Sequence, residues 1–181
     1  MEEKRYNDMQ TVKRRFFAMR NGVIADTLRS AGLPYKIIFG LNLPQIVEIA
    51  AEAPHTPELA EALWANNTTR ESMLLAPMLV DPLSFGLDDA RRWLESVPTA
   101  EVADILCHRL LRKTPYAWEL AESLIDNPIA PFDTYVALRL AFNLVSTSPE
   151  RALAIAGKGG KHPVALALAD EARFLITGEL N

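Results

Sequence analysis

Long apolar runs and all but one cysteine are missing from this sequence, and each absence excludes a class of protein. No stretch of about 18 or more apolar residues is present, and the N-terminal segment lacks the apolar core of a signal peptide, so we expect neither membrane insertion nor secretion. The single cysteine, Cys107, has no partner for an internal disulfide, which agrees with a reducing compartment. We therefore expect a cytoplasmic protein in which Cys107 is an inert core thiol.

Familiar catalytic and metal-binding signatures are also missing. The sequence contains no GxxxxGKS/T, HExxH, GxSxG or CxxC motif, so it gives no local support to a P-loop enzyme, a zinc peptidase, a serine hydrolase or a zinc finger. The histidines, His55, His108 and His162, stand on separate segments, and no two share a chelating spacing. We expect no bound metal and no cofactor.

A strong positive charge is missing as well. The chain has 19 Lys and Arg residues against 23 Asp and Glu residues, a formal charge of -4. Residues 1–36 hold eight basic and four acidic side chains, whereas residues 37–105 hold three and eleven. This pattern allows local nucleic-acid binding by the N-terminal region, but it differs from the basic composition of a dedicated DNA-binding domain.

What the sequence does contain is a succession of helix signals. Apolar residues recur at helical spacing, and the segments Thr56-Pro57-Glu58 and Ser148-Pro149-Glu150 carry the N-cap, proline and acidic order that helix starts favour. Pro77 is expected to kink the helix that opens at Thr68 or Thr69. Residues 35–40 predict a buried loop, with a short strand as the alternative.

The number of these helices decides the fold class. About ten or eleven helices of roughly ten to sixteen residues leave little room for a sheet, so the sequence predicts an all-α protein. Antiparallel pairs recurring every 30 to 40 residues or so favour an α-α superhelix of HEAT-like pairs, with a compact irregular bundle as the alternative. We expect residues 1–181 to form a single domain, whose concave surface would suit a long protein or nucleic-acid partner.

The segment Pro131–Ser146 is apolar almost all the way round, as expected of a helix in the middle of a helical protein. Its polar exceptions, Arg139 and Asn143, are one turn apart on one face, with Tyr135 one turn earlier. Since arginine does not lose its proton, a largely buried Arg139 has to meet a carboxylate, backbone carbonyls, water or an anionic ligand. The sequence leaves open whether that face lies in the core or lines a groove.

The helix expected over Thr99–Lys113 carries a polar stripe that includes Asp104, His108 and Arg112. Spacing alone favours a solvated face with a contact between Asp104 and His108. In the functional alternative, Asp104 lies in a cleft near Arg139. Its negative charge would then stabilise a developing cation, such as the oxocarbenium-like sugar that forms when the bond to a cationic base breaks.

Two further features allow both a functional and a structural interpretation. Trp64 and Trp118 are expected in the core, whereas Trp93, beside two arginines, is the candidate for a groove-facing aromatic that packs against a nucleotide. The segment Gly157–Lys161 either cradles a phosphate through backbone amides and two lysines or, as we favour, forms a turn between helices.

Several segments together resemble a known family. Gly40–Ala50 resembles the Gly, Pro and aliphatic pattern near the start of the AlkD-like DNA alkylation repair proteins, and Leu63-Trp64, Arg70-Glu71 and Ala76–Leu79 resemble the next helix pair. The similarity is diffuse but colinear through the later helices. It implies a HEAT-like superhelix whose concave face grips duplex DNA, and excision of N3- or N7-alkylated purines without base flipping.

The resemblance also implies roles for individual residues. Asp104 matches the aspartate that stabilises the cationic sugar, and Arg139 matches the arginine that assists at the DNA. The chain departs from the family at Ala100, where family members carry a tryptophan four residues before the aspartate. DNA binding by an acidic chain would need a local basic strip, for which the candidates are Lys13, Arg14, Arg15, Arg112, Lys113, Lys158 and Lys161, with Trp93 as the aromatic.

The sequence therefore leads to two hypotheses of different classes. The first is a DNA-binding helical-repeat protein of the DNA alkylation repair type, with alkylpurine DNA glycosylase activity at Asp104 and Arg139. The second is a catalytically inactive relative that uses the same concave surface as a protein-interaction scaffold. A purely structural bundle would be favoured if Asp104 and Arg139 proved distant or fully satisfied by ordinary neighbours.

Overall fold

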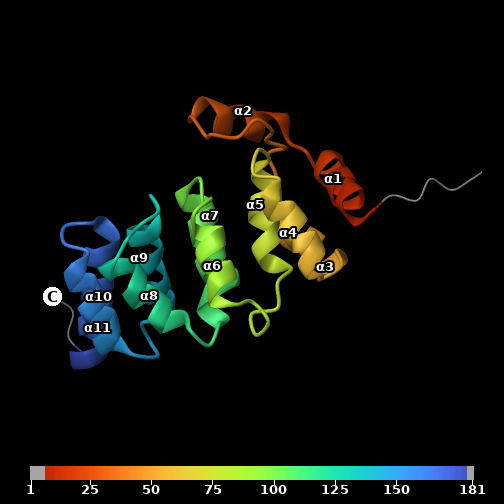
Figure 1. Ribbon diagram of the computed structural model, residues 1–181. Coiled ribbons are helices and arrows are strands. Elements are labelled where there is room, and N and C mark those ends of the chain that lie inside the picture. The colour runs from red at the N-terminus through yellow and green to blue at the C-terminus, as the bar shows by residue number, and fades with distance from the viewer. Residues whose placement is uncertain (1–6, 179–181) are drawn as a thin grey trace, which may run out of the picture. The chain divides into compact units, whose positions relative to one another are not determined.

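The fold is built from α-helices (Figure 1). The computed structural model describes residues 7–178, and within that range it has eleven α-helices, two 3-10 helices and no β-strand. The predicted all-α class and the predicted number of helices are confirmed. No helix of the described range combines the length and the apolar character needed to cross a membrane.

The chain divides into two compact units, Met1–Asp81 and Pro82–Asn181. The single domain expected over residues 1–181 stays a prediction. The first unit contains α1 (Asp8–Ala18), α2 (Gly22–Ser30), α3 (Leu43–Glu52), α4 (Pro57–Ala65), α5 (Arg70–Leu75) and the 3-10 helix η1 (Ala76–Met78). The second contains α6 (Leu87–Leu94), α7 (Ala100–Arg109), the 3-10 helix η2 (Leu111–Lys113), α8 (Ala117–Asp126), α9 (Asp133–Leu144), α10 (Pro149–Lys158) and α11 (Pro163–Thr177).

Most helices begin where the sequence predicts. Thr56 is the N-cap of α4, and its hydroxyl accepts a hydrogen bond from the N–H of Leu59 at 3.3 Å. Thr99 is the N-cap of α7, and its hydroxyl accepts a hydrogen bond from the N–H of Val102. Ser148 is the N-cap of α10. Such caps satisfy backbone donors that the helix itself leaves unpaired.

One helix begins later than expected. α9 starts at Asp133 rather than at Pro131, because Asp133 is buried and holds the turn before the helix. Its Oδ2 accepts hydrogen bonds from the N–H groups of Ile129 at 2.7 Å and Ala130 at 2.8 Å. The N–H of Asp133 in turn donates to the carbonyl of Ala130 at 3.1 Å, which closes a turn over Pro131 and Phe132 and leaves these two residues outside the helix.

Pro77 interrupts the helix that starts after Thr69, as predicted. α5 ends at Leu75, and the chain continues as the short 3-10 helix η1 with Pro77 at its centre. Proline has no N–H to donate and crowds the preceding turn, so a regular α-helix cannot continue through it.

The loop before α3 is held by a buried ion pair. Glu71 is fully buried, and its carboxylate accepts hydrogen bonds from the N–H groups of Phe39 at 3.1 Å, Gly40 at 2.9 Å and Leu41 at 3.3 Å. Arg70 lies 3.0 Å from the same carboxylate and donates to the carbonyl of Leu41. Residues 35–40 form the predicted loop and no strand, but the loop is only partly buried: Tyr35, Ile38 and Gly40 are buried, whereas Lys36 and Ile37 are exposed. One isolated bridge pairs Ile37 with Thr69.

α9 is the central helix of the second unit. It contacts α7, α8, α10 and α11. Four of its apolar residues are fully buried: Val136, Ala137, Leu138 and Leu140. Neighbours on several sides cover its apolar surface, as the sequence predicts for this segment.

The cysteine and two of the tryptophans behave as core residues to different degrees. Cys107 and Trp64 are buried as expected, and burial raises the pKa of the Cys107 thiol, which keeps it protonated and unreactive. Trp118 is only half-buried. Its indole N–H donates to Thr147 at 3.2 Å, and the Cζ of Arg151 lies 5.0 Å from its ring centroid.

Candidate functional site

Asp104 and Arg139 meet in the second unit. The Nε of Arg139, on α9, lies 2.7 Å from the Oδ1 of Asp104, on α7. The side chain of Asp104 is 37% exposed and that of Arg139 is 34% exposed. Arg139 thus has the carboxylate partner that its place on an apolar helix requires, and the pair lies at the protein surface, where a ligand can reach it.

Tyr135 is the third member of this cluster. Its hydroxyl donates to the Oδ1 of Asp104 at 2.9 Å, from one turn before Arg139 on the same face of α9. Both donors therefore act on one carboxylate oxygen, and Asp104 Oδ2 accepts neither bond. Burial, the hydrogen bond to Asp104 and the negative charge of Asp104 raise the pKa of Tyr135 to about 12, so its hydroxyl remains a donor at neutral pH.

Aromatic rings pack around Tyr135. The ring of Phe132 lies edge-on at a centroid distance of 6.3 Å, and the ring of His162 lies at 6.0 Å. His162 is held in place because its Nδ1 accepts a hydrogen bond from the N–H of Val164 at the start of α11. Although Ala100 replaces the expected tryptophan, aromatic side chains from other segments lie beside the Asp104 cluster.

His108 pairs with a residue other than the one that spacing favoured. Its Nδ1 lies 3.2 Å from the Oδ1 of Asn143, whose Nδ2 donates to the backbone carbonyl of Arg139 at 2.8 Å. The prediction of a contact between Asp104 and His108 was wrong, because two side chains of the neighbouring helix α9 donate hydrogen bonds to the Asp104 carboxylate instead. The polar face of α9 is thus tied to α7 at two successive turns.

The basic candidates of the first unit differ in their partners. Lys13 and Arg14 are exposed on α1. Arg15 is half-buried and pairs with Glu48 at 3.1 Å and Glu52 at 2.8 Å, both on α3. These carboxylates neutralise much of the charge of Arg15, which makes Arg15 a weaker candidate for contact with an anionic ligand.

The basic candidates of the second unit also differ. Lys158 Nζ lies 2.6 Å from the Oδ1 of Asp126, which neutralises its charge. Lys113 and Lys161 are exposed, whereas Arg112 is half-buried, with an Nε that has no hydrogen-bond partner among the described residues. A common strip of all seven basic residues stays a prediction.

Trp93 does not face a groove. Its side chain is 0% exposed, and its ring packs edge-on against Phe85 at a centroid distance of 5.0 Å. The adjacent arginines suggested an exposed position, but neighbouring residues of a helix point about 100° apart, so an exposed Arg92 is compatible with a buried Trp93. The expectation of a nucleotide-facing Trp93 was wrong.

The first glycine after α10, Gly159, is explained by packing, and the second, Gly160, by its φ of 59°. A Cβ atom on Gly159 would lie 2.7 Å from the Cβ of Ala165 and 2.9 Å from the Cδ2 of Leu138, which is closer than real side chains approach. Of the segment Gly157–Lys161, the first two residues end α10 and the other three form a tight turn into α11, the interpretation that the sequence favoured. Within residues 7–178, no group of three or more His, Cys, Asp or Glu side chains is arranged to hold a metal ion.

Most of the Asp104 cluster follows from the sequence, but not every aromatic ring around it does. The helical period placed Tyr135, Arg139 and Asn143 on one face, and the spacing from Phe132 to Tyr135 would have added Phe132. Nothing in the sequence connects His162 with Tyr135, because that contact depends on how α11 packs on α9.

Comparison with known proteins gives both a family match and a structural match. The sequence pattern of a family described as DNA alkylation repair enzyme matches residues 12–128, a range that includes Asp104 and ends before Arg139. A solved structure described as "a new family of proteins related to the HEAT-like repeat DNA glycosylases with affinity for branched DNA structures" matches with a TM-score of 0.75 and 16% identity, over 94% of this chain and 76% of that one. No curated protein matches. The HEAT-like helical-repeat fold predicted for this chain is confirmed.

Proposed function

This chain belongs to the DNA alkylation repair enzyme family, whose pattern it matches over residues 12–128, and on that basis we propose that it binds DNA and excises N3- or N7-alkylated purines. The observation that carries the proposal is the partly exposed carboxylate of Asp104, held by Arg139 and Tyr135. A negative group at a ligand-accessible surface, fixed by two donors, suits a reaction that develops positive charge.

In this reaction the main contribution of the protein is electrostatic stabilisation. An alkylated purine carries a positive charge, and when its bond to the sugar breaks, the electron pair leaves with the base, which departs neutral. The sugar becomes an oxocarbenium-like cation, to which water adds with loss of a proton. In our proposal Asp104 stabilises that cation, while Arg139 and Tyr135 fix the carboxylate before the reaction begins.

Two observations support DNA as the partner. The structural relative is described as having affinity for branched DNA structures. In this chain, the exposed Lys13 and Arg14 of α1 offer charges that can replace the counterions of a phosphate backbone. We propose duplex DNA as the substrate, with α1 as part of its contact surface.

The test is release of N7-methylguanine and N3-methyladenine from methylated duplex DNA at low salt. We expect the wild type to release both bases and Asp104→Asn to be slower by about a hundredfold or more, the usual size of the loss of one preorganised electrostatic group. Asp126→Asn is the matched control, because Asp126 is also a partly exposed, ion-paired aspartate, and it should change the rate less than about twofold. Equal rates for the two variants would remove Asp104 from the mechanism.

A catalytically inactive scaffold is the second candidate. It is favoured by the exposed apolar side chains of α11, Leu166, Phe174, Leu175 and Ile176, which are typical of a protein-binding surface. The same assay separates the two functions. A wild-type protein that neither releases methylated bases nor binds duplex DNA would support the scaffold and contradict the glycosylase.

A further inference from the structure

An exposed aromatic ring on α1 lies under a guanidinium group. Phe17 is 58% exposed, which is unusual for a phenylalanine in a folded protein. The Cζ of Arg20 lies 3.8 Å from the Phe17 ring centroid, and an Arg20 NH1 group donates to the Phe17 carbonyl at 2.8 Å. This hydrogen bond holds Arg20 over one face of the ring, while much of the ring remains open to solvent.

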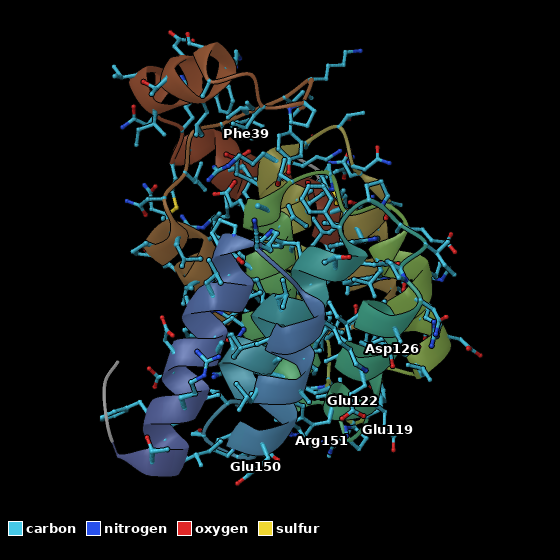
Figure 2. The ribbon with its side chains drawn as sticks, turned by 90° about the vertical axis from the view of Figure 1, so that its left-hand side faces the viewer. Phe39, Glu119, Glu122, Asp126, Glu150 and Arg151 are labelled. Atoms are coloured by element: carbon cyan, nitrogen blue, oxygen red, sulfur yellow. The ribbon has the colours of Figure 1, made fainter. Side chains whose placement is uncertain are left out.

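Phe17 also borders an open hollow that is lined by both apolar and basic side chains. The hollow measures about 430 Å³ and is lined by Lys13, Arg14, Phe17, Ala18 and Phe39. Phe39, labelled in Figure 2, belongs to the loop whose backbone is fixed by Glu71. Its ring packs against the buried ring of Phe16 at a centroid distance of 5.7 Å, so the hollow is built on the core of the first unit.

This combination of groups matches the chemistry of an unpaired nucleotide. A free base can stack on an aromatic ring, and its flanking phosphates pair with lysine and arginine. Bases inside a duplex are already stacked on each other and cannot offer a face to Phe17. An apolar peptide would fill the hollow, but it would gain nothing from the positive charges of Lys13, Arg14 and Arg20.

We propose that the hollow beside Phe17 binds an unpaired nucleotide, so that this protein prefers DNA in which a single-stranded segment adjoins a duplex. The base stacks on Phe17 opposite Arg20, and Lys13 and Arg14 contact the phosphates. This inference rests on the proposed function, because it assumes that the chain binds DNA, and it adds a preference among DNA structures.

The test compares a blunt duplex with the same duplex carrying a single-stranded tail, by fluorescence anisotropy at fixed salt. We expect the wild type to bind the tailed DNA more tightly. Phe17→Ala should weaken binding of the tailed DNA about tenfold, the usual effect of losing one stacked base, and leave the blunt duplex within about twofold. Phe17→Trp should restore the preference, because tryptophan also stacks.

Val23→Ala is the matched control, because Val23 is an apolar side chain of the same unit that is 78% exposed but lies outside the lining of the hollow. It should leave both affinities unchanged. Lys13→Ala together with Arg14→Ala supplies a second variant, which should flatten the salt dependence of binding to the tailed DNA.

The outcomes separate this inference from the proposed function. Methylated-base release with equal affinity for blunt and tailed DNA would overturn the inference alone. Equal weakening of both DNAs by Phe17→Ala would also overturn it, since Phe17 would then contact the duplex. A wild type that binds neither DNA and releases no base would overturn both.

Discussion

Two arginine–carboxylate pairs, one in each unit, differ in burial far more than in geometry. Arg70 and Glu71 are 3.0 Å apart, with side chains that are 7% and 0% exposed. Arg139 and Asp104 are 2.7 Å apart, with side chains that are 34% and 37% exposed. The same two chemical groups thus occupy a dry interior in one case and a wet surface in the other.

The partners of each carboxylate follow from this difference. A buried charge loses its hydration, and only a full set of hydrogen bonds offsets that loss, so Glu71 accepts from three backbone N–H groups as well as from Arg70. Asp104 keeps contact with solvent and accepts from Arg139 and Tyr135. The Glu71 pair therefore serves the fold, whereas the Asp104 pair has the exposure that a ligand requires.

The largest expected effect is the loss of stability when the buried carboxylate of Glu71 is replaced, compared with the loss at Asp104. Glu71→Gln keeps the size of the side chain but removes the charge that faces Arg70 and turns an amide toward backbone donors, so we expect a loss of about 3–5 kcal/mol in the free energy of unfolding. Asp104→Asn should cost less than about 1 kcal/mol. Urea denaturation measures both, and equal losses would mean that burial does not distinguish the pairs.

A slightly smaller effect is expected at the loop that Glu71 holds. Gly40 has a φ of 80°, and a Cβ atom there would lie 2.7 Å from the backbone nitrogen of Ala25. Gly40→Ala should therefore cost about 2–4 kcal/mol, from the left-handed backbone and from the clash together.

Gly32 is the matched control for that variant. It has a φ of 83° but nothing within 4 Å of its Cβ position, so Gly32→Ala should cost only about 1–2 kcal/mol for the backbone conformation. Thermal denaturation of both proteins gives the difference. If the two variants lost the same stability, the close approach at Gly40 would carry no energy.

A smaller effect is expected at Tyr135, which donates a hydrogen bond to Asp104 of the exposed pair. Tyr135→Phe removes one hydrogen bond to Asp104 and should cost about 1 kcal/mol. The folded pKa of about 12 lies above the ordinary tyrosine pKa of 10.0, so Tyr135 contributes stability that is present below pH 10 and is lost as the pH rises toward 12. Tyr135→Phe should therefore weaken the dependence of stability on pH in that window.

Tyr116 provides the control for the pH effect. Its pKa is also raised to about 12, mainly by burial, and its hydroxyl donates to the carbonyl of Phe85 at 2.8 Å. Tyr116→Phe should weaken the alkaline dependence in the same way but leave release of methylated bases unchanged. Urea denaturation in steps from about pH 9 to pH 12 measures the first effect. If Tyr135→Phe left the alkaline stability curve unchanged, Tyr135 would not titrate differently in the folded protein.

The smallest effect is expected at a third pair, between Glu122 and Arg151. Its two hydrogen bonds, at 2.7 Å and 2.9 Å, join side chains that are 39% and 41% exposed, so Glu122→Gln should cost less than about 1 kcal/mol. These side chains are labelled in Figure 2. The hydrogen bond from Arg151 lowers the pKa of Glu122, so this contribution is present above pH 4.5 and is lost as the pH falls below it. If Glu122→Gln still lowered the free energy of unfolding in acid, the loss would not come from the ion pair with Arg151.

The positions of most helices and the faces they present can be predicted from the local sequence. Thr56, Thr99 and Pro77 act on backbone groups within a few residues of themselves, so their effects can be predicted without knowing the fold. The helical period likewise placed Tyr135 and Arg139 on one side of a helix that is otherwise apolar. These are local properties, which depend on the chain within one or two turns.

Which of these faces meet depends on the packing of the helices. Asp104 comes 35 residues before Arg139, and its choice of α9 over its own neighbour His108 depends on how α7 packs beside α9. In the same way, Glu71 reaches the backbone of residues more than two dozen positions earlier, and Trp93 turns inward against Phe85. Periodicity specifies the face of a helix, but the partner of that face is set by packing between helices, which no local spacing encodes.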